Sequence, residues 1–249
     1  LYLFLRDRNY DVFGIDIIEN EYSVQKLLDI KDRIAFLELL NDVNPEIIIH
    51  AAAIKDMKTC QENEKSAFES NVEPSNTILS YLEQNSKCRC IYISSDIVFN
   101  GLKGNYSEKD KTDPINIYGK TKLQSENILK KSMRVSICRT ALVLDYIGSL
   151  DIIPIALEKE LSNDILLNQS LLIKFVYHKL KRGEEIFLSN EHISNPTPVP
   201  LLNILIEKVI SQEICGILHT AGPIQVSRLD FALKVAEVFN LDESLIKIS

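Results

Sequence analysis

Short apolar strands alternate with helical segments along the first 140 residues, and this alternation constrains the fold more than any other feature. The strand-like runs are apolar on both faces, which is typical of a parallel sheet covered by helices on both sides. Right-handed crossovers then predict an α/β fold with a doubly wound parallel sheet. The expected strands are 11–16, 46–50, 88–94 and 135–138, and the expected helices are 1–8, 37–43, 66–85 and 118–131.

The alternation loosens after residue 145. A proline-rich segment covers 195–200, helical spacing returns at 201–209 and 227–239, and 216–220 is strand-like. We therefore expect residues 1–145 to form the sheet domain. Residues 146–249 would form a smaller lobe that is partly interleaved with the sheet.

Charge and cysteine content exclude several classes of protein. The chain of 249 residues has 28 Lys plus Arg against 35 Asp plus Glu, a net charge of −7. Such a surface argues against binding a nucleic-acid polymer or an anionic membrane. No apolar run is long enough for a membrane span, and no signal peptide is visible, so a cytoplasmic location is expected. The cysteines are odd in number and scattered, which favours buried free thiols over disulfides or a metal site. They are Cys60, Cys88, Cys90, Cys138 and Cys215.

Ligands of open α/β sheets bind outside the carboxyl ends of the strands. Asp16 follows the first expected strand, where a carboxylate can accept hydrogen bonds from both hydroxyls of an adenine ribose. Asp29 and Ile30 would flank the adenine. Ala51, Ala52 and Ala53 follow the next strand, and such small residues let a flat ligand approach the backbone. His50, just before them, is expected to be a strand-end histidine whose ring is hydrogen-bonded within the protein, and not a catalytic residue.

Tyr118 and Lys122 give the strongest chemical signal. They are four residues apart on an expected helix, so both project from one face. A nearby ammonium lowers the pKa of a tyrosine, which would let this phenol exchange a proton near neutral pH. Ser95 directly follows a buried strand and could hydrogen-bond the same substrate oxygen. Lys122 could also hold the ribose next to a nicotinamide.

Together these residues resemble the extended short-chain dehydrogenase/reductase family, and within it the dTDP-4-dehydrorhamnose reductase branch. The likeness covers nearly the whole chain. The matching segments are 45–53, 71–72, 94–101, 114–123, 139–140, 218–222 and 227–228.

The resemblance implies an NAD(P)-binding Rossmann fold with a C-terminal substrate-binding lobe. It also implies hydride transfer from NADH or NADPH to the keto carbon of a nucleotide-linked 4-keto sugar, as in deoxysugar (dTDP-rhamnose) biosynthesis. Tyr118 would be the proton donor, Lys122 would tune it and bind ribose, and Ser95 would position the carbonyl. Asn71 would support the cofactor side. The residues expected near the substrate are Asp96, Asn116 and Arg139. A homodimer is left open.

The chain also departs from this family. No Gly-x-Gly-x-x-Gly string is present, and Asn195 stands where relatives often carry an arginine for the substrate phosphates. The first residue is Leu1, and residues 1–8 match the end of the first helix of a Rossmann unit. We therefore expect a fragment of a longer protein that lacks the first strand and the phosphate loop, and that binds dinucleotide poorly by itself.

Two other functions remain open from the sequence. An epimerase or dehydratase of the extended family would use the same Tyr/Lys pair and recycle its bound nicotinamide. A non-catalytic regulatory subunit, of the type that regulates methionine adenosyltransferase, would account for Asn195 and for residues 142–145, where the aromatic residues and glycine common in relatives are missing. The intact Ser95, Tyr118 and Lys122 set argues against the regulatory subunit.

Overall fold

A computed structural model of the chain describes residues 1–20, 24–144 and 172–249. The chain divides into two compact units. The first comprises Leu1–Thr140 and Asn203–Thr220, and the second Ala141–Leu202 and Ala221–Ser249. The first unit takes in the later segment because one of its strands extends the main sheet. The expected boundary between residues 145 and 146 lies outside the described residues.

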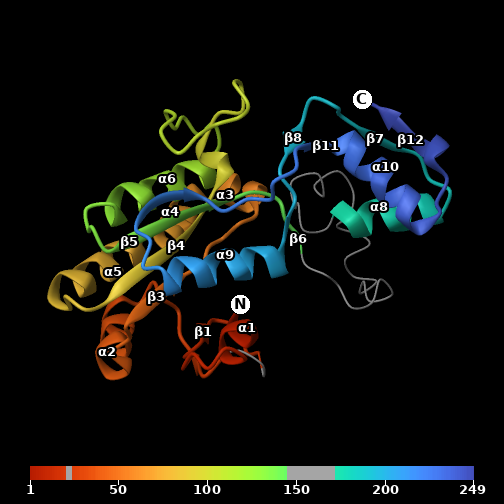
Figure 1. Cartoon of the computed structure of the whole chain (residues 1–249). Helices are drawn as coiled ribbons and strands as arrows, with labels where there is room; N and C mark the ends of the chain where they lie inside the picture. The colour runs from red at the N-terminus through yellow and green to blue at the C-terminus, as the bar shows by residue number, and fades with distance from the viewer. Residues whose placement is uncertain (21–23, 145–171) are drawn as a thin grey trace. The chain divides into compact units, whose positions relative to one another are not determined.

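A four-stranded parallel sheet forms the centre of the first unit, with the strand order β10–β5–β4–β3 (Figure 1). Its strands are β3 (Ile47–His50), β4 (Arg89–Ser95), β5 (Val135–Thr140) and β10 (Gly216–His219). The predicted α/β fold with a parallel sheet is therefore confirmed, and it is Rossmann-like. Because the strands are parallel, their carboxyl ends meet at one edge, where ligands of such sheets bind.

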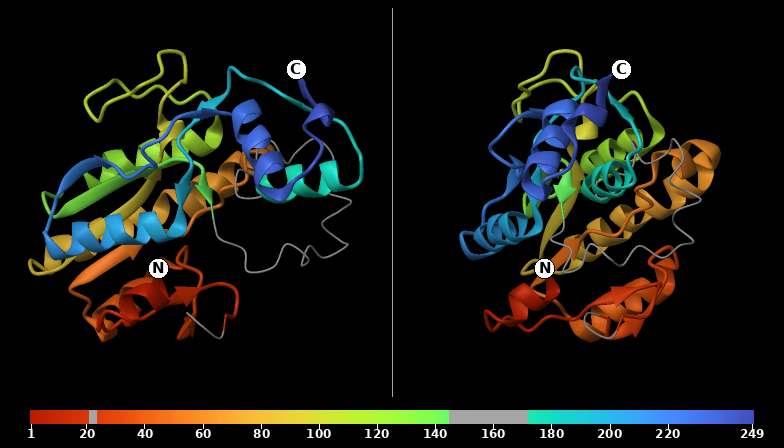
Figure 2. Two further views of the ribbon diagram at one scale, coloured as in Figure 1. Left: turned by 45° about the vertical axis from the view of Figure 1, so that its right-hand side comes forward. Right: turned by 90° about the vertical axis from the view of Figure 1, so that its right-hand side faces the viewer.

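Helices cover both faces of this sheet. Those of the first unit are α1 (Tyr2–Arg6), α2 (Arg33–Val43), α3 (Met57–Glu62), α4 (Glu64–Asn71), α5 (Glu73–Gln84), η1 (Asp96–Val98), α6 (Ile117–Leu129) and the later part of α9 (Val199–Ser211). Helices α5 and α6 lie on one face, and residues 203–211 of α9 lie on the other (Figure 2). The sheet is thus buried on both sides, as the apolar strands predict.

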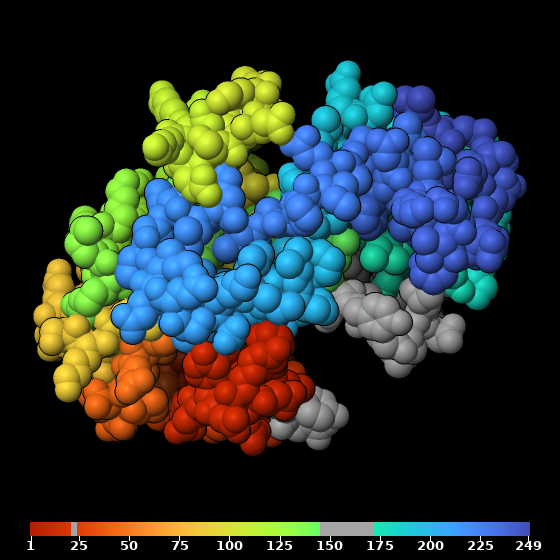
Figure 3. All heavy atoms as spheres, in the orientation of Figure 1, coloured from red at the N-terminus to blue at the C-terminus, as the bar shows by residue number. Residues whose placement is uncertain are grey.

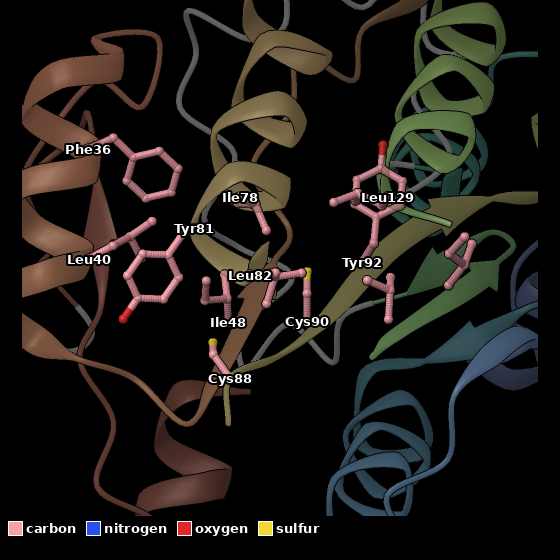
Figure 4. Packing of buried hydrophobic residues seen from close by; sticks show 12 residues of the cluster. Phe36, Leu40, Ile48, Ile78, Tyr81, Leu82, Cys88, Cys90, Tyr92 and Leu129 are labelled. Carbon is pink, nitrogen blue, oxygen red and sulfur yellow. The ribbon is translucent and has the colours of Figure 1, made fainter. Parts of the chain in front are cut away.

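The main hydrophobic core lies between the sheet and helices α2, α5 and α6. Ile48 from β3, Ile78 and Leu82 from α5, and Tyr92 from β4 are among its buried members (Figure 4). Four of the five cysteines are buried free thiols, as expected, whereas Cys215 is exposed.

The expected helix 66–85 is two helices. α4 ends at Asn71 and α5 begins at Glu73, with Pro74 in its first turn. A proline has no amide hydrogen to continue the preceding helix and is favoured in a first turn, so the break falls beside it. Asn71 accordingly lies at the end of α4, not near the start of one long helix.

The expected strand 11–16 is much shorter and lies outside the main sheet. β1 (Ile15–Asp16) pairs only with β2 (Lys26–Leu27) among the described residues, and β3 pairs with β4 alone among them. Ile15 still packs its side chain against the main core. The N-terminal segment lies beside α9 in Figure 3, and the Tyr10 hydroxyl is 3.5 Å from the Glu207 carboxylate.

The second unit has its own core. Its elements are β6 (Val143–Leu144), α8 (Leu172–Lys181), β7 (Ile186–Leu188), β8 (Ile193–Ser194), β9 (Thr197–Pro198), β11 (Val226–Ser227), α10 (Arg228–Phe239), η4 (Glu243–Leu245) and β12 (Ile246–Ile248). Apolar residues of α8, α10 and β7 form this core. Within the described ranges, no helix is long and apolar enough to cross a bilayer.

Candidate active site

The start of α6 is held against the end of β4. The Asn116 side chain caps the helix by accepting a hydrogen bond from the amide of Gly119 at 2.8 Å. A Cβ at Gly119 would overlap the carbonyl oxygen of Ile97 in η1. Only glycine allows this approach. It brings Tyr118 close to the turn that follows Ser95, and it gives Asn116, which we expected near the substrate, a structural role as helix cap.

Ser95 and Asp96 form one hydrogen-bonded turn at the end of β4. The Ser95 hydroxyl donates to the Asp96 carboxylate at 3.1 Å and accepts from the Ile97 amide at 3.3 Å. Ser95 is buried and Asp96 half-buried. The hydroxyl is therefore oriented by the protein at the carboxyl edge of the sheet.

Lys122 lies in the interior, one helical turn after Tyr118. Its Nζ donates to the carbonyl of Ile93 at 2.5 Å and lies 4.2 Å from the centre of the Tyr92 ring. The Tyr92 hydroxyl points toward α6 (Figure 4). Burial lowers the pKa of Lys122 to about 7, and the Glu126 carboxylate opposes this shift. Lys122 therefore changes charge near neutral pH.

The pKa shift that we expected for Tyr118 has the wrong sign. Burial raises the pKa of Tyr118, and the negative charge of Asp96 raises it further. Lys122 has its ammonium on Ile93 and Tyr92, so it does not offset the cost of burying a tyrosinate. Tyr118 is consequently a protonated phenol at neutral pH.

Asn71 ties the loop after β3 to α6. Its carboxamide accepts from the amide of Ile54 at 2.7 Å and donates to the carbonyl of Ile54 and to the hydroxyl of Thr121, both at 3.0 Å. Ile54 directly follows Ala51–Ala53, of which the first two are exposed. Asn71 thus fixes the end of the loop Ala51–Ile54 to α6 through hydrogen bonds.

His50 ends β3 and differs from expectation. It is buried, and its ring lies 5.3 Å from that of Tyr92, but its Nε2 has no hydrogen-bond partner among the described residues. Burial lowers the pKa of His50 to about 3, so the imidazole is neutral. It is not the satisfied strand-end histidine that the sequence suggested.

Arg139 is engaged inside the protein. Its Nε and Nη2 donate to the two carboxylate oxygens of Glu126 at 3.0 and 2.7 Å, and Ser94 donates to the same carboxylate at 2.5 Å. Only Nη1 of Arg139 has no partner in the described part of the chain. Glu126 was not identified from the sequence. Helical spacing could have indicated Glu126, since it lies four residues after Lys122 and eight after Tyr118.

The residues expected around the adenine are placed apart from this group. Asp16 accepts from the amides of Ile17 and Ile18 within its own exposed loop. Asp29 accepts from the Lys31 amide and pairs with its ammonium at 3.3 Å, and Ile30 packs against the main core. No hydrogen bond or ion pair of the described residues joins Asp16 or Asp29 to Ser95, Tyr118 or Lys122.

This arrangement brings a protonated phenol, an oriented serine hydroxyl and a lysine of near-neutral pKa to one strand edge. Such a set can donate a proton to a substrate oxygen on which negative charge develops. Among the described residues, no group of His, Cys, Asp and Glu side chains could hold a metal ion.

The chain also matches a known protein family. A family model described as the RmlD substrate binding domain matches residues 15–248. The chain belongs to the RmlD substrate-binding domain family. This is a family of the extended short-chain dehydrogenase/reductase type, so the resemblance drawn from the sequence motifs is confirmed at that level.

Proteins with two different names are similar to the chain. The bovine (Bos taurus) methionine adenosyltransferase 2 subunit beta is 24% identical over 225 residues, which cover 87% of this chain and 61% of that protein. The chain thus spans about three-fifths of the length of that relative. A dTDP-4-dehydrorhamnose reductase of Aggregatibacter actinomycetemcomitans is 26% identical over 244 residues, 94% of this chain and 72% of that protein.

Two solved structures of dTDP-4-dehydrorhamnose reductases are also similar. A hypothetical dTDP-4-dehydrorhamnose reductase from Sulfolobus tokodaii has a TM-score of 0.79 and 27% identity, covering 99% of this chain and 80% of that one. The Bacillus anthracis dTDP-4-dehydrorhamnose reductase in complex with NADP has a TM-score of 0.81 and 25% identity, covering 100% and 78%.

Proposed function

We propose that the protein carrying this chain is an NAD(P)H-dependent reductase of a nucleotide-linked 4-keto sugar. The observation that carries the proposal is the placement of Tyr118, one turn before Lys122, against the turn formed by Ser95 and Asp96. The similar reductases, one of them in complex with NADP, support the same chemistry.

The state of Tyr118 suits a reduction. When bound, a reduced nicotinamide supplies a hydride, which leaves an alkoxide on the former carbonyl oxygen. An alkoxide is a much stronger base than a phenolate, so a buried phenol of raised pKa can still donate its proton. The Ser95 hydroxyl would hold the carbonyl beside Tyr118, and a charged Lys122 would stabilise the tyrosinate that results.

The chain fits one half of the dinucleotide better than the other. Ala51–Ala53 present only methyl groups after β3. His50, the last residue of β3, has an Nε2 without a hydrogen-bond partner in the described structure. These residues, with Lys122, fit a nicotinamide and its ribose. For the pyrophosphate, the 249 residues contain no Gly-x-Gly-x-x-Gly string to bring helix amides close. We propose Asp16, Asp29 and Ile30 for the adenosine end.

Replacing Tyr118 by phenylalanine tests the proposal. Tyr118→Phe removes the proton donor and leaves the packing almost unchanged. We expect kcat with NADPH and a dTDP-linked 4-keto sugar to fall by about 10²-fold or more, while the midpoint of urea unfolding stays near that of the parent.

Tyr106→Phe is the matched control. Tyr106 stacks on Phe99, and its hydroxyl accepts from the Lys103 amide and donates to the Asn100 side chain within the same surface loop, so its loss should leave kcat unchanged. Retained turnover in Tyr118→Phe would contradict the assignment. Turnover of a nucleotide sugar without net oxidation of the cofactor would instead indicate the epimerase or dehydratase alternative.

A second candidate is a regulatory subunit. Its support is the match to methionine adenosyltransferase 2 subunit beta and the position of Lys122. The Lys122 ammonium is bound inside the protein, to the Ile93 carbonyl and over the Tyr92 ring. Stable co-purification with a methionine adenosyltransferase, with no reduction of any keto sugar, would favour it over the reductase.

A further inference from the structure

Glu126 is a buried carboxylate next to the candidate active site, and it accepts three hydrogen bonds. Its carboxylate accepts from Ser94 Oγ and from Nε and Nη2 of Arg139, while only 2% of the Glu126 side chain is exposed. Ion pairs this deeply buried are costly to desolvate, and apolar replacements are often as stable. The stability of the fold by itself therefore does not require the Glu126–Arg139 pair.

The three partners come from three elements that carry the candidate site. Glu126 lies on α6, on the face that also carries Tyr118 and Lys122. Ser94 immediately precedes Ser95 at the end of β4, and Arg139 lies on the neighbouring strand β5. The carboxylate thus joins the helix of the proton donor to the strand of the serine.

The charges around Lys122 also connect Glu126 to the candidate site. Lys122 is buried, interacts with His50 from β3 and Tyr92 from β4, and lies one helical turn from Tyr118 and from Glu126 on its own helix. His50 is neutral and both tyrosines are protonated at neutral pH. Glu126 is the carboxylate that favours the charged state of Lys122, and Arg139 holds that carboxylate in place from β5.

We propose that Glu126 is a positioning residue: through Ser94 and Arg139 it fixes the Tyr118–Lys122 face of α6 against the end of β4, and it holds a negative charge one helical turn after Lys122. Arg139 then acts as the partner of Glu126 rather than as a substrate ligand. The proposal rests on the proposed reductase function for its kinetic readout but not for its titration readout.

The test uses Glu126→Gln together with Glu126→Gln/Arg139→Met in the intact protein. The single variant leaves a buried guanidinium without its counter-charge and can fail to fold. The double variant removes both charges at similar volume and should recover much of the lost stability in urea. We expect both folded variants to lose about tenfold or more in kcat, with KM for NADPH within about twofold.

The second readout is the Lys122 titration, followed by side-chain NMR of labelled lysine and assigned with Lys122→Met. The pKa of Lys122 should fall in the double variant, and by more in the single variant, where Arg139 is left unpaired. This measurement needs no turnover, so it decides the proposal even if the parent protein reduces no keto sugar.

Glu237→Gln is the matched control. Glu237 lies on α10 and forms an exposed ion pair with Lys234 at 2.7 Å, so its loss should change neither kcat nor the Lys122 titration. A double variant that is as stable as the parent and keeps both the parental kcat and the parental pKa of Lys122 would overturn the proposal. A purely structural role would give that result.

Discussion

At the scale of single residues, burial decides chemistry that spacing suggests only in outline. Tyr118 and Lys122 are four residues apart, which places them on one helix face. Their pKa values move away from each other, because burial favours the neutral form of each side chain. Lys122 becomes a group that titrates near neutral pH, and Tyr118 remains a protonated donor.

His50 gives a pH prediction at this scale. Its pKa is about 3 in the folded protein and 6.5 as the reference value, so the folded state stays neutral where the unfolded state binds a proton. Folding stability should therefore fall as the pH drops from 6 to 4. His50→Asn should remove a slope of about 1.4 kcal/mol per pH unit from that fall.

Urea unfolding of the parent and of His50→Asn at pH 7, 6, 5 and 4 measures this slope. His192 and His219 also have lowered pKa values, so the difference between the two proteins is the relevant quantity. Parallel curves would show that His50 becomes protonated without cost in the folded state.

At the scale of elements, close backbone contacts fix where α6 lies. Gly119 lets the helix touch η1, Asn116 caps it, and Asn71 reaches it through Thr121. The cap is local, whereas the Gly119 and Asn71 contacts join α6 to segments that are distant in the chain. The candidate site therefore depends on how α6 docks as much as on the residues that it carries.

Gly119→Ala tests that docking. The added Cβ would meet the Ile97 carbonyl and the Pro114 ring, and backbone atoms cannot move aside cheaply. We expect a loss of about 1–3 kcal/mol in unfolding free energy, although alanine is the better helix former. Urea denaturation measures it. Lys120→Ala, at the next and exposed position of the same helix, should stay within about 0.5 kcal/mol of the parent. Equal stability of the two variants would show that α6 does not press on η1.

At the scale of the whole molecule, two separate hydrophobic cores serve two units. Leu82 is fully buried in the core of the first unit and Leu188 in that of the second. Both units are built from two stretches of chain, so the units do not follow a single cut in the sequence.

Core truncations should report on the two units separately. Leu82→Ala and Leu188→Ala should each cost about 2–5 kcal/mol, from lost burial and the cavity left behind. In hydrogen exchange followed by mass spectrometry, the protection lost by each variant should concentrate in its own unit. Equal loss across both units from either substitution would indicate a single cooperative core.

The sequence by itself determined the parallel α/β sheet, the helix face shared by Tyr118 and Lys122, and the family. These features follow from local periodicity and short motifs, which a linear chain displays directly. The break between α4 and α5 could also have been predicted, from Pro74. Only the tertiary structure decided the rest: the return of β10 to the sheet edge, the isolation of β1 from it, the burial that sets the charge of Lys122, and the Glu126–Arg139 pair. Each of these depends on desolvation or on partners brought from distant segments. The spacing of residues along one element predicts neither desolvation nor long-range contacts.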